Sequence, residues 1–270
     1  MKKQSLLSLR YIIRILALVL LATCLLSSCS ATAARETVLL TESDEKTDVP
    51  TSATPKKRVA LTFDDGPHNT RTPAIVDELS KYGFHATFFV VGNRVDGTAY
   101  RGGDAMMYAI EAGNEIGIHG YTHELYYNKC TDEQYAAELS DTKKAIRNEQ
   151  KGYQITLMRP IGGAITQERI RSCPYSVVLW DVDSEDWRYK YTSGDSDAEC
   201  REKVDTIVNN VLEDVKDGSI ILMHDIYEST LDAVVILLQQ LDEMGYEVVT
   251  VSELLGDERE AGRTYERADG

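Results

Sequence analysis

The chain has 270 residues and a formal net charge of −15, from 29 lysines and arginines against 44 aspartates and glutamates. So acidic a balance, without a basic patch for phosphates, argues against a nucleic-acid partner. Once the N-terminal segments described next are set aside, the remaining length suits one domain with a substantial core, and no internal repeat is present.

The N-terminus has the pattern of an export signal. Four basic residues precede or interrupt a stretch from Ile15 to Leu26 that is almost wholly apolar, which is typical of a secretory signal and short for a membrane span. The run Leu26-Ser27-Ser28-Cys29 resembles the lipobox of bacterial lipoproteins, which implies a lipid anchor at Cys29. A plain signal peptide cut near Ala31 to Ala34, or an uncleaved anchor, is the alternative.

The chain then divides by composition. Up to Lys57 it is rich in Thr, Ser, Glu and Asp, contains two prolines and lacks an apolar period, which favours a flexible tether. We therefore expect a signal with lipobox at 1–28, a tether at 29–57, a folded domain at 58–256 and a charged, frayed tail at 257–270.

Three of the five cysteines, Cys130, Cys173 and Cys200, lie in the folded part. At most one disulfide is possible among them. Their spacing supports neither a particular pairing nor metal ligation.

Strand-like and helix-like segments alternate along the folded part, which predicts an α/β core. The apolar strand-like runs are Val59–Leu61, Ala86–Val91, the run ending at Ile118, Leu157–Met158, Val177–Leu179, Ile220–Met223 and Val248–Val251. Helical periodicity marks Thr72–Tyr82, Glu133–Glu149, Cys200–Asp217 and Leu231–Met244. The third of these is the clearest, with one apolar stripe and Gly218 as a stop.

Two adjacent carboxylates, Asp64 and Asp65, follow the first apolar strand and lead into a turn fixed by Gly66 and Pro67. An Asp-Asp-Gly triplet alone is most often only a turn. Side by side the carboxylates repel each other, but beside a cation one can ligate the metal while the other stays free as a base. The pair therefore predicts further metal ligands elsewhere in the chain.

Further polar residues follow the other predicted strands. His119 ends one strand, and His123 comes four residues later, close to one helical turn away. Two histidines at this spacing are, alone, more often surface or core residues. Arg159, the run Asp183 to Trp187, and His224 follow three more strands. The carboxyl ends of parallel strands lie on one face, where barrels and open sheets build active sites.

The order of these motifs resembles the polysaccharide deacetylases, the NodB-homology carbohydrate esterases. The resemblance spans about Arg58 to Leu255. It rests on five runs, Thr62-Phe63-Asp64-Asp65, His119 to His123, Arg159-Pro160, Asp183 to Trp187 and Leu222-Met223-His224. It implies an irregular (β/α) barrel with fewer strands than a complete eight-stranded one. It also implies removal of N-acetyl or O-acetyl groups from sugars of chitin, peptidoglycan, xylan or similar polymers.

The resemblance assigns the metal and the base. Asp65, His119 and His123 hold a divalent metal, usually zinc with cobalt as the alternative, and leave positions open for water and the acetyl oxygen. Such a ligand set also suits a hydrolytic zinc. Asp64 is then the general base, and Arg159 pairs with it through a guanidinium fork that a lysine could not reproduce.

The resemblance also assigns the acid and the acetyl pocket. Amide cleavage requires a proton for the departing amine, and His224 matches that general acid. Asp183 matches the carboxylate that keeps this histidine protonated and oriented, while Asp186 is left outside the catalytic set. Trp187 and Leu222 match the walls of the acetyl pocket. The plainer alternatives are that Trp187 is ordinary core and that Leu222 is buried in any case.

Two loops depart from the family pattern. Gly120 stands where the family has Ser or Thr, which removes a hydroxyl that ties the loop to the second metal histidine, so we expect somewhat lower metal affinity. Ile161-Gly162-Gly163 replaces a run with an aromatic that lines the sugar groove, so substrate choice is the property most affected. The amide of Gly162 is still expected to stabilise the tetrahedral oxyanion together with the metal.

The sequence thus predicts a metal-dependent hydrolase that removes N-acetyl groups from cell-wall polysaccharide, foremost N-acetylglucosamine of peptidoglycan. We expect a monomer on the outer face of the bacterial cytoplasmic membrane, or secreted. The alternatives are a chitooligosaccharide or xylan deacetylase, an enzyme specific for muramic acid, or a catalytically weak glycan-binding lipoprotein. A protein that only binds glycans has no need of a base, an acid and all the ligands, which argues against the last.

Overall fold

One parallel sheet organises the residues described by this computed structural model, which are 56–97 and 102–268. Its strands are β1 (Lys57–Asp64), β2 (Thr87–Val90), β3 (Glu115–Ile118), β4 (Leu157–Met158), β5 (Ser176–Val178), β6 (Val182–Asp183), β7 (Ile220–His224), β8 (Tyr246–Val248) and β9 (Thr264–Tyr265). Their order is β6-β7-β1-β2-β3-β4-β5-β9, with β8 also paired to β1. Every one of these strand pairs is parallel. The predicted α/β class is confirmed.

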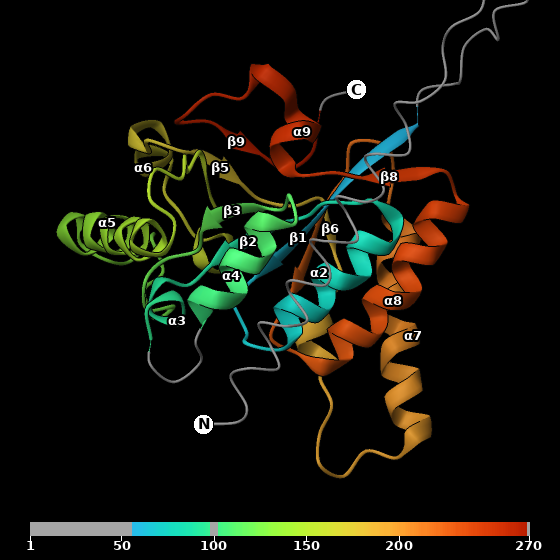
Figure 1. The fold of residues 1–270 in the computed structure, drawn as a ribbon. Helices are drawn as coiled ribbons and strands as arrows, with labels where there is room; N and C mark the ends of the chain where they lie inside the picture. Colours follow the sequence, from blue (N-terminus) through green and yellow to red (C-terminus); the bar gives the residue numbers. More distant parts are fainter. Residues whose placement is uncertain (1–55, 98–101, 269–270) are drawn as a thin grey trace, which may run out of the picture. The chain divides into compact units, whose positions relative to one another are not determined.

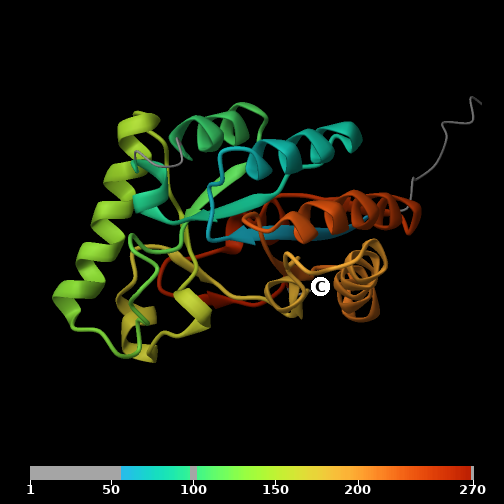
Figure 2. The same ribbon diagram turned by 90° about the horizontal axis from the view of Figure 1, so that it is seen from below.

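Helices surround the strands (Figures 1 and 2). They are α2 (Arg71–Tyr82), α3 (Gly92–Val95), α4 (Gly102–Glu111), α5 (Asp132–Glu149), α6 (Gln167–Ser172), α7 (Asp197–Asp214), α8 (Glu228–Glu243) and α9 (Val251–Leu255), with 3₁₀ turns η1 (Ile161–Gly163), η2 (Asp186–Arg188) and η3 (Gly256–Glu258). Helices α4, α2, α8 and α7 pack against one another in that order, while α5 contacts α3.

The central strand β1 is buried on both faces, and its two faces differ. Val59, Leu61 and Phe63 belong to the large cluster shared with the helices. Ala60 points the other way, into a small apolar cluster with residues of β2, β4, β5 and β7. Because side chains alternate along a strand, Thr62 and Asp64 share the face of Ala60. The inner face therefore changes from apolar to polar toward the carboxyl end of the strand.

Side-chain capping residues account for the observed starts of the helices, which the apolar periodicity predicts less accurately. Ser196 and Glu199 form a capping box that starts α7 before the predicted Cys200. The same helix ends at Asp214, because Val215 is already extended and not because of Gly218. Thr250 caps α9 in the same way, so the strand predicted to continue to Val251 stops at Val248.

The strand register brings the predicted polar residues together. Asp64 on β1 pairs in register with His224 on β7. Ile118 pairs with Met158, so the next residues along the chain, His119 and Arg159, also leave neighbouring strands. Parallel strands deliver such residues to one edge of the sheet.

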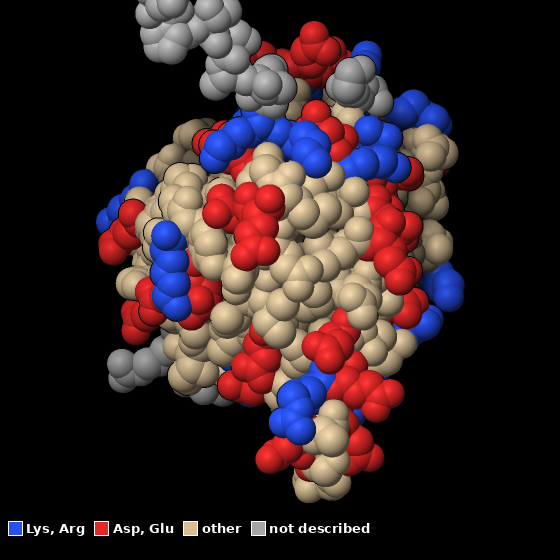
Figure 3. Space-filling view, turned by 90° about the vertical axis from the view of Figure 1, so that its right-hand side faces the viewer, with Lys and Arg blue, Asp and Glu red and all other residues tan. Residues whose placement is uncertain are grey.

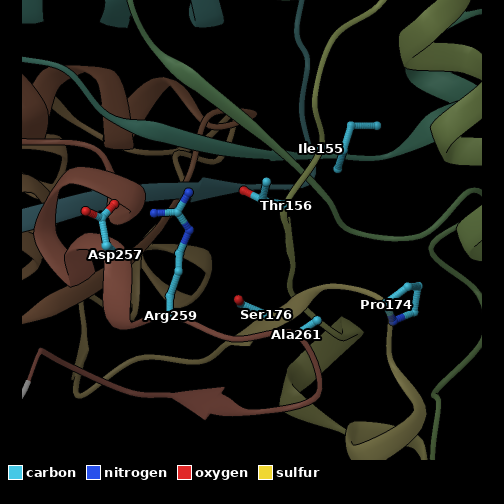
Figure 4. Close-up of a pocket in the computed structure, with 7 residues that line it drawn as sticks. All are labelled: Ile155, Thr156, Pro174, Ser176, Asp257, Arg259 and Ala261. Carbon is cyan, nitrogen blue, oxygen red and sulfur yellow. The ribbon is translucent and has the colours of Figure 1, made fainter.

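The C-terminal segment corrects the expectation of a frayed tail. β9 pairs with β5 through the couples Val177–Thr264 and Val178–Tyr265. The segment closes a pocket that also contains Thr156 and Ser176, at the amino ends of β4 and β5 (Figure 4). This pocket lies away from the carboxyl ends of the strands, and its Arg259 donates to backbone carbonyls of Ser252 and Gly256.

The predicted signal, the lipobox at Cys29 and nearly all of the tether lie outside the described residues, although Lys57, the last tether residue, is the first residue of β1. Within the described part, no helix is both long and apolar enough to cross a membrane. Cys130, Cys173 and Cys200 are free thiols. On the face in Figure 3, acidic side chains form several separate groups, and basic ones form a band near the top with others at the sides and near the bottom.

Candidate active site

Arg159 and Asp64 form a buried ion pair at the carboxyl ends of β4 and β1. Nη1 of Arg159 lies 2.9 Å from Oδ1 of Asp64 and 2.7 Å from Oγ1 of Thr62. Its Nε and Nη2 donate to the carbonyls of Val178 and Leu179 at 3.2 and 2.9 Å. These contacts use the guanidinium on every side. The predicted pair is therefore present, but through a single Nη1–Oδ1 contact and not a two-pronged fork, because the rest of the guanidinium binds Thr62 and two carbonyls.

Asp65, His119 and His123 converge beside this pair. Nε2 of His119 and Nε2 of His123 lie 3.4 and 2.8 Å from Oδ1 of Asp65, and one possible ligand atom from each residue lies within 4.8 Å of the others. Oδ1 of Asp65 is buried and accepts no hydrogen bond of acceptable geometry. An unsatisfied carboxylate oxygen facing two imidazole nitrogens is a donor set that suits a divalent metal.

The ring of His119 is held in the tautomer that a ligand needs. Its Nδ1 lies 3.0 Å from the carbonyl oxygen of Arg159, and because a carbonyl only accepts, Nδ1 must donate. Nε2 therefore faces the cluster, 3.4 Å from Asp65 and 3.7 Å from Oδ2 of Asp64. Arg159 thus orients the Asp64 carboxylate with its side chain and the His119 ring with its backbone.

The turns that carry two of these ligands have unusual backbone conformations. Asp65 has φ 73° and His123 has φ 63°, in the left-handed region that residues with a Cβ rarely adopt. Strain of this kind persists where surrounding contacts fix the turn, often at functional sites.

The electrostatics of the cluster favour a cation. Burial raises the pKa of Asp65, but contacts with His119 and His123 outweigh burial and hold this pKa well below its usual range. Burial lowers the pKa of His119, yet the carboxylates of Asp64 and Asp65 outweigh it and raise this pKa overall. Two carboxylates therefore set the local field, and a bound cation would replace the protons on the histidines.

His224 lies at the end of β7 with its ring fixed by Asp186. Nδ1 of His224 is 2.7 Å from Oδ1 of Asp186, whose Oδ2 accepts from the His224 amide at 2.7 Å and from Oγ1 of Thr230 at 2.6 Å. Burial lowers the pKa of His224, but the Asp186 carboxylate outweighs it and raises this pKa to about 9. The raised pKa favours the protonated imidazole at neutral pH, which is the form that a general acid requires.

The predicted partner of His224 was Asp183, and this pairing is wrong. Asp183 ends β6, and its Oδ1 accepts the amide of Glu185 at 2.8 Å. Glu185 then adopts φ 54° and turns the chain, so that the next residue, Asp186, comes to lie against His224. The sequence shows two carboxylates three residues apart, and only the turn between them decides which one reaches the histidine.

The residues predicted to line the acetyl pocket differ in how far they are exposed to solvent. Leu222 is buried on β7. Trp187 is nearly half exposed, with the Arg188 guanidinium 4.8 Å from its ring centroid, so it is not an ordinary core residue. Gly162 has φ 58° in the turn after Pro160.

Three residues near the site were missed by sequence reasoning. Thr62 receives a hydrogen bond from Arg159, and its position two residues before Asp64 on the same strand face could have indicated this. Tyr126 lies against the Arg159 loop, since a Cβ on Gly162 would be 3.2 Å from its ring. Glu138 reaches the loop before His123 from α5. The last two contacts join segments far apart in sequence and leave no local signal.

Fold and site together define a class of protein, a curved parallel (β/α) sheet that presents an Asp-His-His set of possible metal ligands at the carboxyl ends of its strands. A family profile described as polysaccharide deacetylase matches residues 51–177. A peptidoglycan-N-acetylglucosamine deacetylase of Bacillus cereus is 35% identical over 208 residues, which cover 74% of this chain and 89% of that protein. The chain belongs to the polysaccharide deacetylase family, as the motif order predicted.

Two further relatives are longer proteins. The peptidoglycan-N-acetylglucosamine deacetylase PgdA of Listeria monocytogenes is 34% identical over 81% of this chain and 43% of its own length. The peptidoglycan-N-acetylmuramic acid deacetylase PdaC of Bacillus subtilis is 37% identical over 74% and 39%. The solved structure of PdaC superposes with a TM-score of 0.65 and covers 74% of this chain and 90% of that one. This confirms the irregular barrel, while the chain spans about two fifths of the length of these two relatives.

Proposed function

We propose that this protein is a metal-dependent deacetylase of peptidoglycan that hydrolyses the N-acetyl group of N-acetylglucosamine. One observation carries the proposal. The buried Asp64–Arg159 pair, the cluster of Asp65, His119 and His123, and the Asp186-bound His224 all lie at the carboxyl ends of strands of one parallel sheet. A base, a metal site and an acid are the three elements of metal-assisted hydrolysis of an amide.

The metal half of the site prepares the nucleophile. Asp65, His119 and His123 would hold a divalent metal, which we propose to be zinc, and the metal would act as a Lewis acid that lowers the pKa of a bound water to about 7. Asp64 accepts the proton of the attacking water, because the contact with Arg159 orients its carboxylate beside the cluster. Oδ2 of Asp64, which Arg159 leaves free, lies 3.7 Å from Nε2 of His119.

The developing oxyanion requires hydrogen-bond donors. In the turn after Arg159, the amides of Gly163 and Ala164 donate to the carbonyls of Pro160 and Ile161 at 2.9 and 3.1 Å. This leaves the amides of Ile161 and Gly162 to stabilise the tetrahedral oxyanion.

The acid half of the site releases the amine. Asp186 binds Nδ1 of His224, so Nε2 carries the proton available to the substrate. Because Asp64 and His224 pair in register on neighbouring strands, the base and the acid flank the bond to be cleaved. His224 gives its proton to the sugar nitrogen as the carbon–nitrogen bond breaks, which yields a free amine and acetate.

The choice of substrate and location rests on the relatives and on the sequence. Two of the relatives named above act on N-acetylglucosamine and one on N-acetylmuramic acid, all within peptidoglycan. The export signal and the proposed lipid anchor at Cys29 would place the enzyme outside the cytoplasmic membrane, where the wall lies within reach of a short tether.

Acetate release from purified peptidoglycan by the full chain with zinc tests the proposal. Wild-type protein is compared with Asp64→Asn, and with Asp104→Asn on the exposed side of α4 as a matched control. We expect release that stops with chelator and in Asp64→Asn but not in Asp104→Asn. Release from chitin or xylan oligomers alone would overturn peptidoglycan as substrate. Absence of release from all three polymers by metal-loaded protein would overturn the enzyme proposal.

A further inference from the structure

Glu138 is a buried carboxylate committed to one loop. It projects from the inner face of α5 and is 5% exposed. Its Oε2 accepts from the amides of Tyr121 and Thr122 at 2.5 and 3.0 Å, and its Oε1 accepts from Oγ1 of Thr122 at 2.8 Å. Both oxygens are thus bonded to the segment that leads to His123. A buried carboxylate that accepts several hydrogen bonds holds the donor groups firmly in place.

The hydrogen bonds that begin at Glu138 extend to the residue after His123. Oγ1 of Thr122, which donates to Glu138, also lies 3.3 Å from the amide of Glu124, which donates to it. The residues on both sides of His123 are therefore connected to one carboxylate. His123 itself has φ 63°, a conformation that its own backbone does not favour and that its neighbours must hold.

Gly120 has a reason to be glycine once Glu138 is considered. A Cβ at this position would lie 3.0 Å from Oε2 of Glu138 and 2.8 Å from the hydroxyl oxygen of Tyr127, and the backbone has φ 100°. Contacts this short force the neighbouring atoms apart, and both belong to buried side chains. The loop can approach the carboxylate only without a side chain at 120.

The two metal histidines are consequently held by different means. His119 directly follows β3, is buried, and has its ring fixed by the carbonyl of Arg159. His123 lies in an exposed loop, and its Nε2 contacts Asp65. The position of His123 therefore depends on what fixes the loop, and Glu138 provides three of those contacts.

We propose that Glu138 is a positioning residue of the metal site, which acts through the loop at 120–123 to bring His123 to Asp65 and His119. The inference rests on the metal site of the proposed function. It replaces the expectation that Gly120 loosens this loop, because the glycine admits a carboxylate where a hydroxyl would otherwise be needed.

Zinc affinity of the full chain, measured without substrate by competition with a chelating indicator, tests this role. The variants are Glu138→Ala and Glu138→Gln, each in the wild-type and in the His123→Ala background. Glu133→Gln, an exposed glutamate of the same helix, is the control. We expect Glu138→Ala to weaken zinc binding ten- to hundredfold, Glu138→Gln to weaken it less because one acceptor oxygen remains, and Glu133→Gln to leave it unchanged.

The double variants separate positioning from general support of the fold. If Glu138 acts through His123, its removal in the His123→Ala background changes zinc affinity by no more than about twofold, since the two losses are then not additive. An equal loss in both backgrounds, or unchanged zinc affinity in both Glu138 variants, would overturn the inference. Should Glu138→Ala not fold, Glu138→Gln carries the same comparison.

The outcomes also separate this inference from the proposed function. Zinc binding that depends on Glu138 through His123, in a protein that releases no acetate, supports the positioning role and overturns the deacetylase. Acetate release by a protein whose zinc affinity does not depend on Glu138 supports the deacetylase and overturns the positioning role. A wild-type chain that binds no zinc overturns both.

Discussion

The strand ends and the loops of this site differ in how their side chains are held. Arg159 is 0% and His119 is 2% exposed; the Arg159 guanidinium makes four hydrogen bonds, and the His119 ring is held by one to the carbonyl of Arg159. By contrast, the side chain of His123 is 41% exposed, and Trp187 and Tyr126 are 45% and 50% exposed. The strand-end residues are thus fixed by buried contacts, whereas the loop residues are open to solvent. Substitutions in the two regions should therefore affect different measurable quantities.

The largest effect is expected for the base. Asp64→Asn should lower kcat by a factor of about 10² to 10⁴, because an amide accepts no proton at neutral pH, while zinc affinity changes little. Steady-state acetate release and indicator competition on one preparation check both statements. A variant that loses zinc together with activity would contradict the division between base and ligands.

Breaking the buried ion pair should affect stability as well as activity. Arg159→Met leaves the Asp64 carboxylate buried without its partner, and removal of one member of a buried pair costs about 3 to 5 kcal/mol of unfolding free energy. Urea unfolding measures the loss. Arg71→Met, which removes a partly exposed partner of Glu228, is the control, and its expected cost is below about 1 kcal/mol. Equal costs would contradict the distinction between interior and surface pairs.

Asp186→Asn should move the pH profile without moving zinc affinity. The pKa of His224 is raised from 6.5 to about 9, so the pairing stabilises the fold fully below pH 6.5, and this stabilisation is lost as pH rises through about 9. Without the carboxylate, the alkaline decline of kcat/KM should begin at lower pH. Asp183→Asn is the matched comparison, and a larger shift in that variant would return the role to Asp183.

The smallest effects are expected among exposed aromatics. Tyr126→Ala should raise KM for peptidoglycan by a few fold, since an aromatic contact contributes about 0.5 to 1.5 kcal/mol, and kcat should hold. Trp187→Ala tests the predicted acetyl wall by the same assay. Tyr108→Ala, an exposed tyrosine on α4, is the control. A loss of kcat in Tyr126→Ala would place it among the groups that act on the reacting atoms.

The same division explains what could be predicted from the sequence. The site residues at strand ends could be predicted, because an apolar run followed by Asp, His or Arg indicates both a strand and the position of its carboxyl end. Asp64, Asp65, His119, Arg159 and His224 were all located in this way. The pairing of His224 with Asp183 was wrong because the amino-acid sequence does not indicate the left-handed turn at Glu185. Glu138 and Tyr126 reach the site across 16 or more residues, where no periodicity connects them.

The pairing of β1 with β7 determines how late in folding the site can assemble. The first described strand lies against a strand about 160 residues later, and Thr62 on β1 donates to the carbonyl of Ile221 at a sequence separation of 159. Contacts of such high sequence separation form late, after the intervening chain has paid the entropy of loop closure. A nascent or truncated chain that ends before β7 contains Asp64, Asp65, His119 and His123 but lacks His224. The proposed set of base, metal ligands and acid can therefore assemble only after β7 has been synthesised.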